Sequence, residues 1–144
     1  MIIVADASVL VGELLRARGR ALILHPRVQL VVAEHQWNEV EHELARRLSI
    51  LVARGRLTTE RRLTLEEAVQ HVLDVQGIEI IARSAYQHME AVARRRVPRD
   101  PNDWAPVALA LVFDAAILTG DNDFLGCGCP TWTVETLREE LGEP

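Results

Sequence analysis

Short apolar segments alternate with longer amphipathic segments along this chain of 144 residues, and no other feature limits its fold as strongly. The apolar runs are continuous, which is typical of strands buried on both faces of a parallel sheet. The longest amphipathic segment, residues 34–54, repeats its apolar side chains every three or four positions, as a helix with one buried face does. Strands that alternate with helices predict a parallel sheet covered by helices on both faces.

We therefore predict an α/β fold of three layers, α/β/α, with a parallel central sheet of about five strands in one domain over residues 1–144. The predicted strands are residues 2–5, 28–33, 78–82, 115–118 and 131–134. Six helices are predicted. Three have predicted ranges, 34–54, 83–95 and 135–141. The other three have predicted starts: at Ser8, at the capping-box pattern of Thr64 and Glu67, and near Asp103.

Composition favours a globular cytoplasmic protein. Apolar residues make up 49% of the chain and charged residues 26%. The start is too short and too soon charged for a signal peptide, and no apolar run approaches the roughly 18–20 residues of a membrane helix. Cys127 and Cys129 are separated by one glycine, outside the usual zinc and redox spacings, so we expect two reduced thiols in a tight loop.

Five of the seven Asp residues gather at three places where a predicted strand or helix meets a loop. They are Asp6, the pair Asp100 and Asp103, and the pair Asp121 and Asp123. In open parallel sheets, ligands bind beyond the carboxyl ends of the strands. Acids gathered at such an edge repel one another and require a cation, and oxygen ligands suit Mg²⁺ or Mn²⁺. The pattern predicts a metal site for phosphate chemistry.

Each acid also has a simpler structural explanation. Asp6 and Asp103 stand where helix caps are expected, and Asp121 is placed as a turn former. These roles account for each residue singly, but not for their common edge. A zinc site made by His35 and His42 with a Glu between them is a less favoured alternative, because it lacks further ligands nearby.

The order of these motifs resembles the PIN-domain family of metal-dependent ribonucleases, in particular its VapC-like members. The resemblance runs from residue 2 to about 134 through D-A-S at 6–8, a Glu in the second helix, R-D-P-N-D-W-A-P-V-A-L-A-L at 99–111 and I-L-T-G-D-N-D-F at 117–124. It implies a parallel sheet flanked by helices. It also implies three or four acids that hold one or two Mg²⁺ or Mn²⁺ ions for RNA cleavage, which leaves 5′-phosphate and 3′-hydroxyl ends. Many members are toxins silenced by an antitoxin protein, and many form homodimers.

The resemblance assigns roles to individual acids. Asp6 resembles the first acid of the family, Asp103 the third and Asp121 the fourth, with Asp123 as an auxiliary ligand. The second acid is a Glu near the start of the helix after the second strand, where Glu39 fits best.

Four further residues surround this predicted set. Glu43, one helical turn after Glu39, is the alternative second acid. Thr119 resembles the hydroxyl residue that precedes the fourth acid, and Ser8 has a similar polar role beside the first. Asp100 either supports the ligands or only orients the turn.

All sixteen basic residues are Arg, and the net charge of the chain is −5. Arg94, Arg95, Arg96 and Arg99 form the cluster that leads directly into the Asp100–Asp103 segment, so we predict that they bind the RNA backbone. The simpler reading of each cluster is a solvated helix face.

Two other enzyme classes with an Asp after the first strand fit poorly. A HAD-type phosphatase needs Asp-x-Asp there, whereas this chain has Asp6-Ala7-Ser8, and a receiver domain needs a Lys that this chain lacks. The favoured function is a metal-dependent endoribonuclease. The alternative is a catalytically inactive PIN-like scaffold that binds nucleic acid or protein. Toxin and housekeeping nuclease both stay open.

Overall fold

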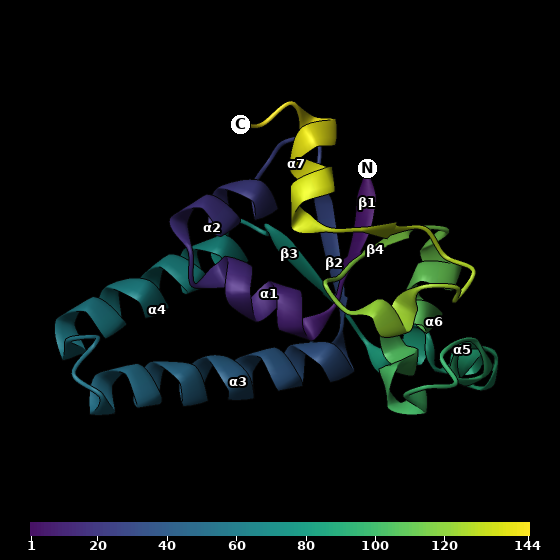
Figure 1. Ribbon diagram of the computed structural model, residues 1–144, viewed down its shortest axis with the longest axis horizontal. Coiled ribbons are helices and arrows are strands. Elements are labelled where there is room, and N and C mark those ends of the chain that lie inside the picture. Colours follow the sequence, from purple (N-terminus) through teal and green to yellow (C-terminus); the bar gives the residue numbers. More distant parts are fainter.

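The computed structural model describes all 144 residues and contains a five-stranded parallel sheet in the order β3-β2-β1-β4-β5 (Figure 1). The strands are β1 (Ile2–Ala5), β2 (Gln29–Ala33), β3 (Ile78–Ile81), β4 (Ala116–Leu118) and β5 (Thr131–Trp132). β1 lies at the centre, where Val4 pairs in register with Val31 of β2 and Ile117 of β4. The predicted α/β class and parallel sheet are confirmed.

Seven α-helices cover the two faces of the sheet. They are α1 (Ala7–Leu14), α2 (Ala17–Ile23), α3 (Glu34–Ala53), α4 (Thr59–Asp74), α5 (Glu90–Arg96), α6 (Trp104–Phe113) and α7 (Val134–Leu141). Side chains alternate along β1, so Ile3 and Ala5 join the core under α1 to α4 and α7, whereas Val4 joins the core under α5 and α6. The three predicted layers are therefore present (Figure 1).

Three local predictions were wrong or incomplete. α4 begins at Thr59, five residues before the predicted start at Thr64, because Thr58 caps it by accepting the N–H of Arg61 at 3.2 Å. The segment 83–95 is two 3₁₀ turns followed by the short α5, with the buried Tyr86 between the turns. α2 was not predicted, and Gly19 lets it pack directly against the main chain of Glu13 in α1.

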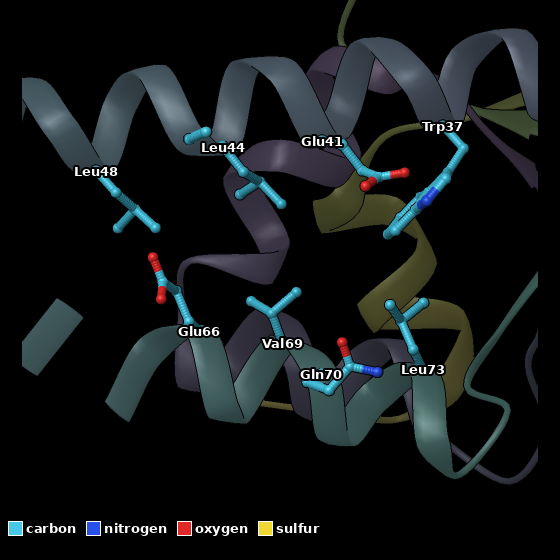
Figure 2. Close-up of a pocket in the computed structure, with 9 residues that line it drawn as sticks. Trp37, Glu41, Leu44, Leu48, Glu66, Val69, Gln70 and Leu73 are labelled. Atoms are coloured by element: carbon cyan, nitrogen blue, oxygen red, sulfur yellow. The ribbon is translucent and has the colours of Figure 1, made fainter. Parts of the chain in front are cut away.

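α3 and α4 enclose an apolar groove of about 210 Å³ on their facing sides. Figure 2 shows Trp37, Leu44 and Leu48 on α3 opposite Val69 and Leu73 on α4. The first turn of α3 lies beside the start of α1, where Gln36 Oε1 accepts the N–H of Ala7 at 2.8 Å. None of the helices combines the length and the apolar character that crossing a membrane requires.

Candidate metal centre

Asp6 follows the last residue of β1 and is buried at the carboxyl edge of the sheet. Its main-chain N–H donates to the carbonyl of Leu118 in β4 at 3.0 Å, and its Oδ2 accepts hydrogen bonds from Ser8 at 2.9 Å and Thr119 at 3.1 Å. Although Asp6 occupies the N-cap position of α1, its carboxylate makes no capping bond. Burial raises the pKa of Asp6, the bonds from Ser8 and Thr119 oppose that rise, and the charge of Asp121 adds to it.

Asp121 lies just beyond the end of β4, two residues after Thr119. The Thr119 hydroxyl oxygen accepts the N–H of Asp121 at 2.9 Å while its proton goes to Asp6, so one side chain links two of the predicted acids. Asp121 Oδ1 in turn accepts the N–H of Asp123 at 2.8 Å. The turn-forming role of Asp121 is therefore real, and it brings Asp123 to the same place.

Asp103 stands at the start of α6, where its carboxylate makes no capping bond to the helix. The preceding turn is shaped by Asp100, whose Oδ1 accepts the N–H of Asn102 at 3.1 Å. Burial raises the pKa of Asp103 to about 6, and the charges of Asp100, Asp6, Asp121 and Asp123 add to the rise. The carboxyl group of Asp103 is therefore close enough to four other acids for their negative charges to raise its pKa.

Asp103, Asp121 and Asp123 each place one carboxylate oxygen within 4.8 Å of the oxygens of the other two. Three oxygen donors this close suit a hard divalent cation, and the absence of His and Cys among them favours Mg²⁺ or Mn²⁺ over Zn²⁺. A cation would also remove the repulsion that raises the pKa of Asp103. The donor set fits the ion that the sequence predicts.

The two candidates for the second acid on α3 have different surroundings. Burial raises the pKa of Glu39, the nearby His35 opposes this, and the charges of Asp6 and Asp100 add to the rise. Glu43 instead binds Arg46 at 2.6 Å and Arg47 at 3.1 Å, and these hydrogen bonds lower its pKa to about 2. Glu39 is the residue coupled to the other acids, whereas Glu43 is engaged with arginines.

The predicted zinc alternative does not assemble. His35 Nε2 lies 3.5 Å from Glu39 Oε1, but His42 joins no group of three metal-binding side chains with them. The ring of His35 stacks on Trp104 with centroids 6.4 Å apart. Trp104 is only 2% exposed, so it packs in the core and presents no free face to a base.

The predicted RNA-binding arginines have partners within the protein, with one exception. Arg94 donates to the Pro101 carbonyl at 3.0 Å and lies over Trp104, and Arg96 donates to the Cys127 carbonyl at 3.2 Å. Arg99 lies 3.8 Å from Asp123, and Arg95 is exposed with no ion pair. Arg94 and Arg96 thus shape the loops around the acids, while Arg95 and Arg99 keep their side chains exposed.

Gln36 is a buried residue beside the site that the sequence did not reveal. Its Oε1 accepts the N–H of Ala7 at 2.8 Å, which ties the start of α3 to the start of α1. The only signal was a polar residue next to Trp37 at the start of a long amphipathic helix.

Comparison with known proteins agrees with this architecture. A family model described as PIN domain matches residues 4–142. The structure of PAE2754 from Pyrobaculum aerophilum is similar with a TM-score of 0.66 at 19% identity, covering 99% of this chain and 90% of that one. VapBC2 from Rickettsia felis, bound to a DNA fragment from its promoter, has a TM-score of 0.62 at 12% identity, covering 92% of this chain and 98% of that one. Comparison with curated protein sequences gave no match. Since the family model spans nearly the whole chain, the protein belongs to the PIN-domain family.

Proposed function

We propose that this protein is an Mg²⁺- or Mn²⁺-dependent endoribonuclease that hydrolyses phosphodiester bonds in RNA. The observation that carries the proposal is the trio of Asp103, Asp121 and Asp123, whose oxygens lie within 4.8 Å of one another. Asp6 lies beside this trio, held by Thr119. PIN domains are generally nucleases, so family membership supports the same reaction class.

In this proposal Asp6, Glu39, Asp103 and Asp121 hold one or two ions, and Asp123 is an additional ligand. A bound divalent ion activates water and neutralises charge on the phosphate and the leaving oxygen. Ser8 and Thr119 fix the orientation of the Asp6 carboxylate through their two hydrogen bonds. Asp100 has a different role: it accepts the N–H of Asn102 and so shapes the turn that presents Asp103.

No protein base is needed beside these acids. His35, beside the proposed second acid, pairs with Glu39 and stacks on Trp104. The arginine cluster supplies positive charge at the rim, chiefly through Arg95 and Arg99, because Arg94 and Arg96 are bonded to neighbouring carbonyls.

We extend the proposal to biological role and assembly. One similar structure is that of a VapBC complex, and the present chain covers 98% of the matched chain in that structure. On this likeness we propose that the protein is a toxin of a toxin–antitoxin pair, silenced by an antitoxin protein, and that it forms a homodimer.

A cleavage assay tests the proposed reaction. Purified protein is incubated with end-labelled single-stranded RNA in Mg²⁺ or Mn²⁺, with EDTA as the control. Cleavage that requires the ion and leaves 5′-phosphate ends supports the proposal. RNA binding without turnover in either ion would contradict it and favour the inactive scaffold.

A further inference from the structure

A polar groove of about 520 Å³ begins beside the acids and runs between α1 and α7, two helices that Figure 1 labels. Thr119 and Gly120, the two residues before Asp121, line its inner end. Ser8, which donates to Asp6, lines it as well. This α1–α7 groove therefore borders the candidate metal centre, because two of its lining residues, Ser8 and Thr119, are hydrogen-bonded to Asp6.

The wall that α1 contributes is open because of Gly12. A Cβ atom built on Gly12 would meet no other atom within 4 Å, so this residue borders free space. Gly120 is nearly as open, with the Val9 side chain 4.0 Å from its built Cβ. Two residues without side chains leave room for an extended chain at this point.

Three arginines from three separate elements line the same groove: Arg16 before α2, Arg47 on α3 and Arg138 on α7. The two carboxylate oxygens of Glu13 are divided between Arg16 at 3.4 Å and Arg138 at 3.2 Å. The single negative charge of Glu13 therefore neutralises only part of the positive charge of these two guanidinium groups.

The positive charge of Arg47 is also only partly neutralised, because its partner Glu43 binds Arg46 as well. Glu135 adds one more carboxylate to the lining. Arg16 and Arg47 remain 71% and 44% exposed, so their donors are available to a ligand. The groove therefore presents two exposed guanidinium groups to a ligand.

We propose that the α1–α7 groove binds the phosphate backbone of the RNA strand next to the bond that is cut, with Arg16 and Arg47 as the main phosphate contacts. Guanidinium forks match phosphate oxygens. This inference rests on the proposed function. It adds a substrate-binding surface outside the Arg94–Arg99 cluster.

A second polar groove, of about 430 Å³, lies on the other side of the acids in the chain. Arg96, Arg99, Asn122 and Asp123 are among its lining residues. Thr119 and Gly120 line the α1–α7 groove, and Asn122 and Asp123 line the second groove, so Asp121 stands between the two pairs in the chain. A strand that lies in both grooves passes directly over the acids, and arginines on either side offset their repulsion of the phosphates.

The test is RNA binding without catalysis, measured by fluorescence anisotropy with a labelled oligouridylate RNA in EDTA over a series of salt concentrations. The double variant Arg16→Gln/Arg47→Gln should bind about tenfold more weakly than the wild type. The slope of the logarithm of its affinity against the logarithm of the salt concentration should become smaller in magnitude by about 1.4, which corresponds to two lost phosphate contacts with a single strand. The matched control is Arg27→Gln/Arg61→Gln, which removes the same charge from two exposed arginines outside both grooves and should change the affinity by less than about twofold.

Gly12 offers an independent variant that leaves every arginine in place. Since its Cβ position is open, Gly12→Glu and Gly12→Arg should both fold, with Gly12→Glu weakening RNA binding and Gly12→Arg strengthening it. Equal affinities for the Arg16/Arg47 and control double variants, or for the two Gly12 variants, would overturn the inference. Failure of the proposed function is a separate result, because it is absence of Mg²⁺- or Mn²⁺-dependent cleavage, whatever the groove binds.

Discussion

Thr119 donates its hydroxyl proton to Asp6 Oδ2 at 3.1 Å, although the two residues are 113 positions apart in the sequence. The same hydroxyl oxygen accepts the N–H of Asp121 at 2.9 Å. Strands β1 and β4 are neighbours in the sheet, so this one side chain sets the relative positions of two candidate metal ligands.

Replacing Thr119 should therefore weaken metal binding more than it disturbs the fold. Thr119→Val removes a hydrogen bond that lowers the pKa of Asp6, and we expect the affinity for Mn²⁺ to fall by about tenfold to a hundredfold, as for other residues that orient ligands. Thr119→Ser keeps the hydroxyl and should bind Mn²⁺ nearly as the wild type does. Calorimetric titration measures both, and an unchanged affinity in Thr119→Val would show that the bond does not orient the ligand.

The raised pKa of Asp103 predicts that the metal-free protein becomes more stable as the pH falls. The pKa of Asp103 is about 6 in the folded protein, against an ordinary value of 3.8, so the folded state holds its proton more tightly than the unfolded state does. The free energy of unfolding of the metal-free protein should rise as the pH falls from above 6 toward 4, and this contribution is lost as the pH rises through 6. Asp6 and Glu39, whose pKa values are also raised, act in the same direction.

Thermal unfolding in EDTA at pH 7.5 and pH 5.5 measures this effect. Asp103→Asn lacks the titrating group, so it should be more stable than the wild type at pH 7.5. Its stability should also increase less than that of the wild type between pH 7.5 and pH 5.5. Identical pH profiles for the two proteins would mean that burial and the neighbouring acids do not raise the pKa of Asp103.

Glu39 and Glu43 form a matched pair on one helix, because both are acids and only the first is coupled to Asp6 and Asp100. Glu39→Gln should lower the affinity for Mn²⁺ and the rate of RNA cleavage. Glu43→Gln should leave metal affinity within about twofold, since that carboxylate is engaged with Arg46 and Arg47. The reverse result would make Glu43 the second acid.

The sequence predicted the parts of the fold that depend on hydrophobic periodicity. It identified all five strands to within two residues at each end and the long helix to within one, because their apolar patterns are uninterrupted. It missed α2, whose packing depends on the absence of a side chain at Gly19. It also placed the start of α4 at Thr64, since a capping-box pattern there resembled the cap that Thr58 in fact provides.

The same division applies to the candidate site. Strand ends and loop motifs were enough to nominate the acids, because parallel strands bring their carboxyl ends to one edge. The partner of Arg96 could not be predicted, because it is a main-chain carbonyl 31 residues further along the chain. The partners of Glu43 lie three and four residues along the same helix, a spacing typical of helical ion pairs that the sequence prediction did not use. The α1–α7 groove was equally hidden, because its arginines come from three separate elements.

Two glycines in neighbouring helices test the packing of α1 against α2. A Cβ atom on Gly19 would collide with the main chain of Glu13, whereas one on Gly12 would meet nothing. Gly19→Ala should lower the free energy of unfolding by about 1–3 kcal/mol. Gly12→Ala should raise it by about 0.5–1 kcal/mol, because alanine is the better helix former. Urea unfolding compares them, and equal stabilities would contradict the packing of α2 on α1.

The most direct measurement of the central claim is the rate of RNA cleavage by Asp6→Asn, Asp103→Asn and Asp121→Asn in saturating Mn²⁺, with circular dichroism to verify that each variant is folded. Asparagine preserves the size of the side chain but removes the charge that holds the cation. If these acids form one metal centre, each variant should lose about a hundredfold or more of the activity, exceeding the typical loss for residues that merely orient ligands. Folded variants that cleave RNA as fast as the wild type would show that the reaction does not take place at this cluster of acids.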